Sequence, residues 1–166
     1  MIVSDLMSSN VETVTMDTLL SDIWKIFKEH RFHHLPVVDE NNKLVGMISD
    51  RDVLFHISPR VEAGNATVAE IEVLRKPAHQ FMSRGPLTVY PNTSASRALR
   101  TIINQSVSCL PVVDDEHNIL GILTWRDVIK FMVKRLDGKR NEEADASEND
   151  SQDDSSKGIE IVVAEE

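Results

Sequence analysis

Hydrophobic residues in the first quarter of the chain follow the period of a helix. Leu20, Ile23, Trp24 and Phe27 lie at positions i, i+3, i+4 and i+7, so they share one helical face. Such a face is typical of a helix that packs against a core. The same spacing recurs later in the chain, with smaller side chains, at Ala95, Ala98, Leu99 and Ile102.

Polar residues suited to helix capping precede both of these segments. Their side-chain oxygens can accept a hydrogen bond from a free amide in the first helical turn. We expect Asp17 or Thr18 to cap the first helix and Asn92 or Thr93 to cap the second.

Two apolar runs after the first helix have the length and composition of β-strands. Residues 35–38 and 44–49 are apolar and contain several β-branched side chains, and the five polar residues 39–43 between them suit a hairpin. Residues 11–15 predict a short opening strand, and a further helix is expected to begin near Asp50. The predicted unit therefore has the element order β-α-β-β-α.

The pattern recurs 75 positions later without a gap. Leu35-Pro36-Val37-Val38-Asp39 returns as residues 110–114, and the run from Gly46 to Asp52 returns as residues 121–127. The pairs Thr13-Val14 and Met7-Ser8 recur at the same offset, as Thr88-Val89 and Met82-Ser83. We interpret the chain as a tandem duplication. A unit of this size buries little surface alone, so the two copies are expected to pack against each other.

The duplication divides the chain into four segments. We expect the first repeat in residues 1–57, a linker with a helix near 67–74 in residues 58–81, and the second repeat in residues 82–136. The last helix is expected to run from Trp125 toward Arg135. Residues 137–166 are rich in Gly, Ser, Asn, Asp and Glu, which predicts a disordered tail with one apolar island at Ile159–Val163.

Charge and composition exclude several classes of function. The segment from Glu142 to Glu166 holds ten acidic residues and one lysine, so it carries the whole formal charge of −9 and the preceding residues are balanced. A balanced body has no basic surface for duplex DNA or anionic lipid, so nucleic acid binding is not expected. No apolar run reaches the roughly 20 residues of a membrane span, and the N-terminal residues do not have the pattern of a secretory signal. The single cysteine, Cys109, excludes an internal disulfide. Together these features predict a cytoplasmic protein.

Each repeat contains a Gly-x-x-[Ser/Thr]-x-x-Asp motif where a strand is expected to meet a helix. The motif places Ser49 and Asp52 in the first repeat and Thr124 and Asp127 in the second. One interpretation is structural: the hydroxyl caps the helix and the Asp reaches back to it. The other is functional, because a helix N-terminus attracts phosphate and a nearby carboxylate can accept the hydroxyls of a ribose.

These motifs, present in both repeats in one register, resemble those of CBS domains, which pair to form a Bateman module. The resemblance covers roughly residues 1–135. It implies an α/β (α+β) fold in which two β-α-β-β-α repeats pack sheet to sheet with pseudo-two-fold symmetry and form two clefts. It also implies that the clefts bind AMP, ADP, ATP or S-adenosylmethionine, that no cofactor is obligatory, and that the module forms a homodimer.

The resemblance assigns binding roles to residues in both repeats. It implies that the hydroxyl residue and the final Asp of each motif hold ribose or phosphate. The two residues before each Leu-Pro also contact ligand in the family: His33-His34 suits phosphate, and Ser108-Cys109 suits an adenine edge. The complete set of expected binding residues is Thr13, His33, His34, Leu35, Pro36, Ser49, Arg51, Asp52, Thr88, Ser108, Cys109, Leu110, Pro111, Thr124, Arg126 and Asp127.

Several of these residues also have a structural interpretation. The histidine pair can be an ordinary helix end, favoured by the helix dipole. Arg51 and Arg126 can be solvated helix residues, and Cys109 can be a small core residue. Adjacent histidines without a third ligand at suitable spacing do not predict a metal site.

Three classes of function remain open. The first is a non-enzymatic sensor that binds an adenosine-containing ligand and signals in trans to an effector protein. The second is a ligand-free dimerisation or interaction scaffold that uses the surface of the module or the acidic tail. The third, an enzyme, is disfavoured because the sequence contains no catalytic dyad, metal-ligand cluster or phosphate-binding glycine-rich loop.

Overall fold

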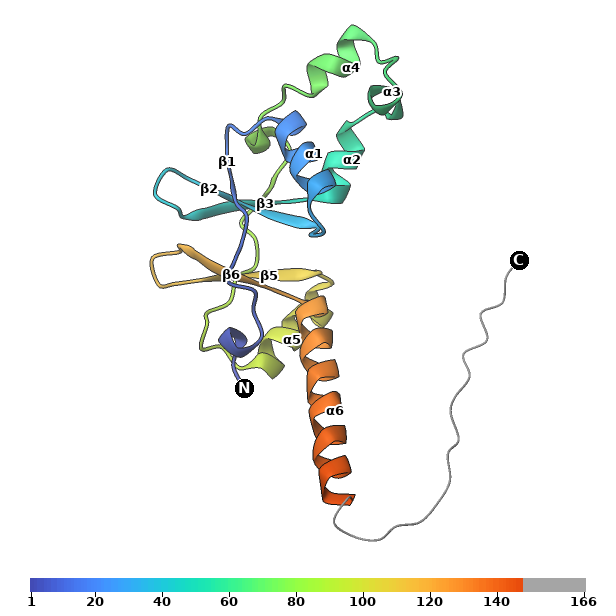
Figure 1. Ribbon diagram of the computed structural model, residues 1–166. Coiled ribbons are helices and arrows are strands. Elements are labelled where there is room, and N and C mark those ends of the chain that lie inside the picture. Colours follow the sequence, from blue (N-terminus) through green and yellow to red (C-terminus); the bar gives the residue numbers. More distant parts are fainter. Residues whose placement is uncertain (148–166) are drawn as a thin grey trace, which may run out of the picture. The chain divides into compact units, whose positions relative to one another are not determined.

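A computed structural model describes the backbone of residues 1–147 and the side chains of residues 1–137 (Figure 1). The chain forms two units, Met1–Lys130 and Phe131–Glu166. In chain order the elements are η1 (Val3–Asp5), β1 (Val14–Thr15), α1 (Leu20–Glu29), β2 (His34–Val38), β3 (Leu44–Ser49), α2 (Asp50–His56), α3 (Pro59–Glu62), α4 (Val68–Val73), η2 (Ala78–Gln80), β4 (Ser83–Arg84), α5 (Ala95–Gln105), β5 (Cys109–Val113), β6 (Ile119–Thr124) and α6 (Trp125–Ser147).

The first repeat supplies three strands of a four-stranded sheet in the order β1-β2-β3-β4, and β4 comes from the start of the second repeat. β1 runs parallel to β2, whereas the other neighbours are antiparallel. The apolar face of α1 packs on this sheet as predicted: Leu20 and Ile23 are fully buried in one cluster with Leu35 and Ile48. Burial of four such side chains is a main source of stability for this half of the unit.

The second repeat is built in the same way, with fewer regular strands. β5 and β6 pair antiparallel in the same register as β2 and β3, 75 positions later. Single bridges between Val89 and Val112 and between Ser8 and Ile122 take the places of β1 and β4. Helix α5 covers this sheet with small side chains, and its Ala95 and Ala98 are buried.

The two sheets face each other across an apolar layer, as the duplication predicts. Leu44 and Met47 of β3 and Cys109 and Val113 of β5 are buried in one cluster. The sheets also meet through the backbone at the hairpin ends, where the amide of Leu44 donates to the carbonyl oxygen of His117 at 3.0 Å. The mixed α+β architecture with two paired repeats is therefore confirmed, with α1 and α2 outside one sheet and α5 outside the other (Figure 1).

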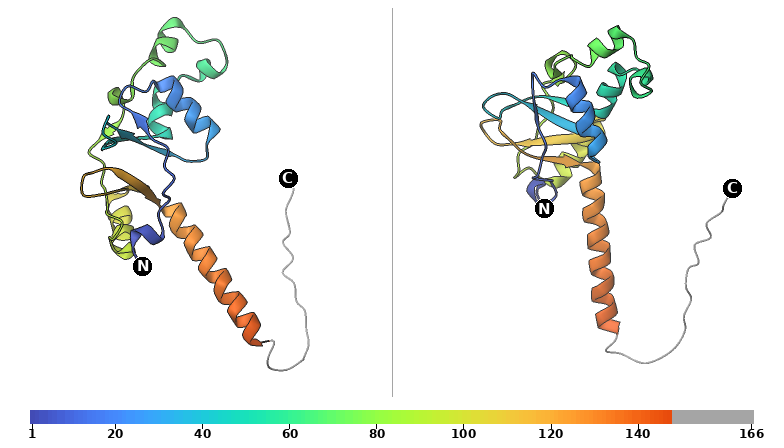
Figure 2. Two further views of the ribbon diagram at one scale, coloured as in Figure 1. Left: turned by 60° about the vertical axis from the view of Figure 1, so that its left-hand side comes forward. Right: turned by 45° about the horizontal axis from the view of Figure 1, so that its top comes forward.

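The segment at the start of each sequence repeat packs on the opposite repeat. The amide of Val3 donates to the carbonyl of Thr93 at 2.9 Å, and the amide of Ala78 donates to the carbonyl of Thr18 at 2.9 Å. Both views in Figure 2 show the N-terminal η1 beside α5 of the second repeat. Each repeat thus lends its first residues to the other, and we call this arrangement the exchange. The sequence did not predict it. The segments that follow η1 and η2, residues 8–12 and 83–87, are the exchanged segments, and they line the clefts described below.

The predicted N-caps of α1 and α5 are wrong. The helices begin after Leu19 and Ser94, and neither residue makes a side-chain capping bond. Thr18 instead accepts the amide of Thr15 at 3.0 Å within the preceding turn, and Thr93 makes the equivalent bond to Tyr90. The first helical amides have distant backbone partners instead: that of Leu20 donates to the carbonyl of Lys76 at 2.8 Å.

Other boundaries differ from the predicted ones. The opening strand is limited to Val14–Thr15. The linker helix is confirmed as α4, with Thr67 as its N-cap. α6 continues through Ser147, beyond the predicted end, because residues 137–147 include many good helix formers such as Lys, Arg, Glu and Ala. The rest of the predicted tail, including Ile159–Val163, lies outside the described residues. Among the helices that are described, none combines the length and apolar character required to cross a bilayer.

Candidate functional site

The repeated Gly-x-x-[Ser/Thr]-x-x-Asp motif caps a helix in both repeats. Asp52 Oδ2 accepts the amide of Ser49 at 2.8 Å and its hydroxyl at 2.7 Å, and the amide of Asp52 donates back to Ser49 Oγ at 3.3 Å. Thr124 and Asp127 repeat all three bonds, at 2.8, 2.5 and 3.2 Å. The structural interpretation of the motif is therefore confirmed.

The cap uses one carboxylate oxygen and leaves the other available. Asp127 Oδ1 accepts only the hydroxyl of Ser8, at 3.0 Å, among the described residues. Asp52 Oδ1 accepts no hydrogen bond from them. A carboxylate offers about four lone-pair sites, so capping leaves acceptor capacity for a ligand. The structural and functional interpretations of the motif are thus compatible.

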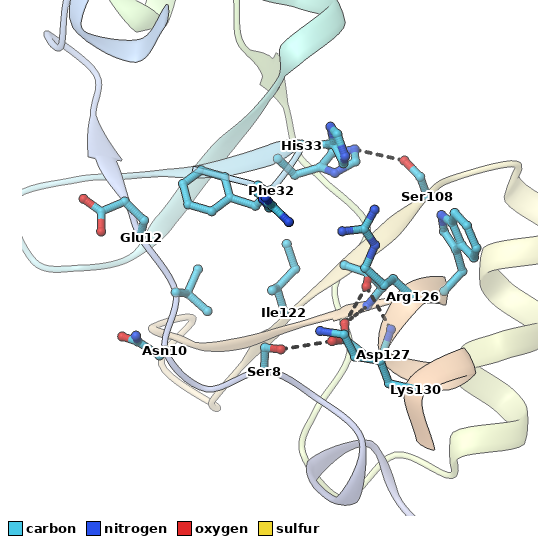
Figure 3. A pocket seen from close by; sticks show the side chains of 15 residues that line it. Ser8, Asn10, Glu12, Phe32, His33, Ser108, Ile122, Arg126, Asp127 and Lys130 are labelled. Carbon is cyan, nitrogen blue, oxygen red and sulfur yellow. Dashed lines mark hydrogen bonds between the residues drawn. The ribbon is translucent and has the colours of Figure 1, made fainter. Parts of the chain in front are cut away.

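One cleft opens around Asp127 and has a volume of about 310 Å³. We call it the Asp127 cleft. Its walls come from the exchanged segment 8–12, the loop 31–34 that leads into β2, and the junction of β6 with α6 (Figure 3). It is lined by Ser8, Asn10, Val11, Glu12, Arg31, Phe32, His33, His34, Ser108, Ile122, Thr124, Trp125, Arg126, Asp127 and Lys130.

A second cleft of about 320 Å³ opens around Asp52. We call it the Asp52 cleft. It is built from the corresponding segments: the exchanged segment 83–87, the loop 106–109 and the junction of β3 with α2. It is lined by His34, Met47, Ser49, Asp52, Ser83, Pro86, Leu87, Ser106, Val107, Ser108, Cys109 and Pro111.

Each cleft combines residues from both repeats. His33 lies with Asp127 of the second repeat, and Cys109 lies with Asp52 of the first. His34 and Ser108 line both clefts, and His34 Nε2 lies 2.9 Å from Ser108 Oγ. This hydrogen-bonded pair therefore forms a wall shared by the two clefts.

The expected binding residues divide into three groups. His33, Thr124, Arg126 and Asp127 line the Asp127 cleft, Ser49, Asp52, Cys109 and Pro111 line the Asp52 cleft, and His34 and Ser108 line both. The side chains of Leu35 and Leu110 are fully buried in the core. Along with these two, the expected residues outside the lining of both clefts are Thr13, Pro36, Arg51 and Thr88.

Sequence reasoning missed residues that the exchange brings to the clefts. Ser8 and Ser83 recur at the 75-residue offset and line corresponding walls, so the Met-Ser repeat was a usable signal. Arg31 and Lys130 have no counterpart of the same type in the other repeat, and no motif marked them. The fold alone brings Arg31 beside Asp127. Lys130 lies three residues after Asp127 on α6, and this helical spacing was a usable signal.

Burial sets the protonation of two lining residues. It lowers the pKa of His34 below its usual 6.5, more than the Asp50 carboxylate raises it, so the imidazole is neutral at pH 7. Burial also raises the pKa of the Cys109 thiol to about 12, which favours its interpretation as a small core residue. The neighbouring His33 is held by Asp50, with Nδ1 and Oδ2 2.7 Å apart. No group of three or more candidate metal-ligating side chains is found in the part of the chain that the structure describes.

The CBS domain family model matches the chain twice, at residues 3–59 and 78–134. The chain belongs to the CBS domain family. The two matches contain both motif copies and all the residues that line the two clefts. The clefts are therefore those of a CBS pair, and such pairs are generally regulatory rather than catalytic.

Known CBS proteins resemble this chain over most of its length. A CBS domain-containing protein of Dictyostelium discoideum is 31% identical over 137 residues, which cover 82% of this chain and 94% of that protein. CBSX2 is a CBS-pair protein of Arabidopsis thaliana. Its crystal structure in complex with AMP is similar to this chain, with a TM-score of 0.67 and 29% sequence identity. The likeness covers 80% of this chain and 96% of that chain.

A second solved CBS pair contains other adenosine compounds. The CBS domain pair of protein MJ0100, in complex with 5′-methylthioadenosine and S-adenosyl-L-methionine, has a TM-score of 0.65 and 26% identity. The likeness covers 81% of this chain and 98% of that chain.

Proposed function

We propose that this CBS pair is a non-enzymatic sensor that binds an adenosine-containing ligand in its clefts and signals in trans to an effector protein. The observation that carries the proposal is the same in both clefts: a carboxylate at the start of a helix has one oxygen outside the capping bonds and borders a cavity of about 310 or 320 Å³. The AMP complex of CBSX2 and the complex of MJ0100 with two adenosine compounds support this ligand class.

The ribose is assigned to the capping carboxylates. Asp127 Oδ1 and Asp52 Oδ1 can each accept the hydroxyls of a ribose, because the cap uses only Oδ2. In the Asp127 cleft, the Ser8 hydroxyl already donates to Asp127 Oδ1, and Ser8 Oγ remains able to accept a hydrogen bond from a sugar hydroxyl. A bound ribose would thus join the exchanged N-terminal segment to α6.

The lining of the Asp127 cleft suits the other parts of a nucleotide. Phe32 and Ile122 offer apolar surface for a base between the polar end at Glu12 and the basic end at Arg126 (Figure 3). Aromatic and aliphatic surfaces stabilise a base by stacking and burial. The guanidinium of Arg126 is suited to phosphate because it presents several donors in one plane.

A thermal-shift screen tests this function. We expect AMP, ADP, ATP or S-adenosylmethionine to stabilise the protein, by about 1.4 kcal/mol at ten times the dissociation constant. For a domain of this size that energy corresponds to several degrees in Tm. Asp127→Asn should reduce the shift from a ligand of the Asp127 cleft, whereas Asp115→Asn, in an exposed turn outside both clefts, should not. If no adenosine compound raises the Tm, the proposal is wrong.

A specific observation favours a second function, self-association. Leu54 and Phe55 on α2 are 66% and 90% exposed, and Trp125 and Ile129 on α6 are 54% and 47% exposed. Leu54 and Ile129 are equivalent positions in the two repeats, so the internal pseudo-two-fold offers both helices to a second copy of the chain. Apolar surface of this kind is typical of an interface.

Sedimentation equilibrium tests the homodimer. We expect the wild-type protein to sediment as a dimer and Phe55→Glu to sediment as a monomer, because the substitution would bury a charge in the interface. Ile103→Glu is the matched control, since Ile103 on α5 is 74% exposed. A monomeric wild-type protein at concentrations of about 10–100 μM, where even weak dimers form, would contradict the homodimer.

A further inference from the structure

The two clefts share a scaffold and differ in charge. Three basic side chains line the Asp127 cleft: Arg31, Arg126 and Lys130. Among the residues that line the Asp52 cleft, none is Lys or Arg, and Asp52 is the one carboxylate. Counting the arginines, the lysine and the carboxylates, the lining of the first cleft sums to one positive charge and that of the second to one negative charge.

The difference follows from substitutions at equivalent positions. Arg31 corresponds to Ser106, which lines the Asp52 cleft without a charge. Lys130 corresponds to Phe55, whose side chain is 90% exposed and outside the lining. The third basic residue, Arg126, corresponds to Arg51, which is also basic but does not line the Asp52 cleft. The carboxylate therefore lines both clefts, whereas basic side chains line only one.

The basic groups of the Asp127 cleft lie where phosphates attached to a bound ribose would be. Arg126, Asp127 and Lys130 come from the first two turns of α6, at the opposite end of the cleft from Glu12 (Figure 3). The N-terminus of this long helix adds positive potential at the same end. A ribose on Asp127 would thus place its 5′ phosphates among cations that offset the carboxylate.

The Asp52 cleft has the opposite character. Met47, Leu87 and Val107 give it an apolar lining, with hydroxyls from Ser49, Ser83, Ser106 and Ser108. A phosphate placed here would lose water next to Asp52 without gaining a positive partner among the lining residues, which disfavours it. An uncharged thioether or a cationic sulfonium on the 5′ carbon would meet apolar contacts and a carboxylate instead.

We infer that the two clefts are specialised by ligand charge. The Asp127 cleft takes an adenosine ligand that carries phosphates, and the Asp52 cleft takes an adenosine ligand whose 5′ substituent is neutral or positive. The inference rests on the proposed function, because it assumes that an adenosine group binds in each cleft. Arg51 is the basic residue most able to oppose it, since it is adjacent to Asp52 in the sequence and exposed outside the cleft lining.

Calorimetric titration of the two single-cleft variants tests the inference. Asp52→Asn leaves the Asp127 cleft intact, and Asp127→Asn leaves the Asp52 cleft intact. Each is titrated with 5′-methylthioadenosine, S-adenosylmethionine, AMP, ADP and ATP at low and high salt. In Asp52→Asn, affinity should rise from AMP to ATP, fall with salt, and fall about tenfold on adding Arg126→Ala and Lys130→Ala.

The Asp127→Asn variant should show the reverse order. It should bind 5′-methylthioadenosine or S-adenosylmethionine more tightly than AMP or ATP, and adding Arg51→Ala should leave that order unchanged. Arg97→Ala with Arg100→Ala removes two charges from α5 outside both clefts and is the matched control for charge removal.

The outcomes separate this inference from the proposed function. ATP binding as tight in Asp127→Asn as in Asp52→Asn would overturn the specialisation while leaving an adenosine sensor. Loss of the charge preference on Arg51→Ala would overturn it as well. Failure of all five compounds to bind either variant or the wild-type protein would overturn the proposed function itself.

Discussion

Gly46 and Gly121 lie in β3 and β6, the second strand of each hairpin, where the start of the other repeat pairs with that strand. A Cβ at Gly46 would lie 2.6 Å from Met82 Sδ and 2.9 Å from the backbone oxygen of Ser83. At Gly121 the same atoms belong to Met7 and Ser8, at 2.7 and 3.0 Å. The repeated glycines and the repeated Met-Ser pairs are therefore parts of one contact. This contact brings Ser8 and Ser83 to the clefts.

At the residue scale, Gly46→Ala is expected to destabilise the fold. The new methyl group would push β4 away from β3, because the backbone oxygen cannot move aside as a flexible side chain can. We expect a loss of about 1–3 kcal/mol, the range for overpacking in a core. Urea unfolding measures it. Adding Met82→Ala should restore only part of the loss, and a Gly46→Ala protein as stable as wild type would contradict the contact.

At the element scale, the exchanged segments are structural parts of the opposite repeat. Val3 of η1 is fully buried, although it is near the chain terminus. Ala78, its counterpart in η2, is also fully buried. Each short helix closes the N-terminal end of a long helix, since the carbonyl oxygens of Thr93 and Thr18 accept their amides.

The stability of the second repeat is therefore expected to depend on the N-terminal segment. Val3→Ala should lower the free energy of unfolding by about 2 kcal/mol through lost burial and a residual cavity. Val68→Ala on α4 is the matched control, because Val68 is 78% exposed and should change stability little. Denaturant titration of both variants measures the difference. Equal stabilities of the two variants would contradict a structural role for η1.

The shared wall predicts communication between the clefts. His34 and Ser108 line both and are hydrogen-bonded, so a ligand that displaces either side chain alters the other cleft. Ser108→Ala is expected to change ligand affinity in both single-cleft variants, whereas Lys130→Ala should change it only where the Asp127 cleft is intact. Calorimetry measures both. An effect of Ser108→Ala on one cleft alone would contradict the shared wall.

Local features of the sequence predicted the elements, and distant contacts decided the rest. The face of α1, the hairpins and the caps at Ser49 and Thr124 were predictable, because each depends on residues a few positions apart. The N-caps of α1 and α5 were not, because their amides are satisfied by carbonyls of Lys76 and Met1. The same non-local exchange brings Ser8 to the Asp127 cleft, which local patterns could not show. Arg31 reaches that cleft through the packing of the two repeats.

At the scale of the whole molecule, the duplication produces two clefts that are built from equivalent segments. The loop of one repeat and the helix start of the other meet at each cleft, so each site needs both copies. Capping fixes the two carboxylates on rigid elements, while the loops and exchanged segments supply the variable lining. Such a division allows the lining to diverge without loss of the fold.

Isothermal titration of the full chain and of the double variant Asp52→Asn with Asp127→Asn tests the central claim most directly. The claim predicts saturable binding of at least one adenosine compound to the wild-type protein. It also predicts that the double variant, folded by circular dichroism, binds the compound at least about tenfold more weakly, because both ribose acceptors lose their charge. Equal affinity in the two proteins, or no binding by the wild-type protein, would contradict it.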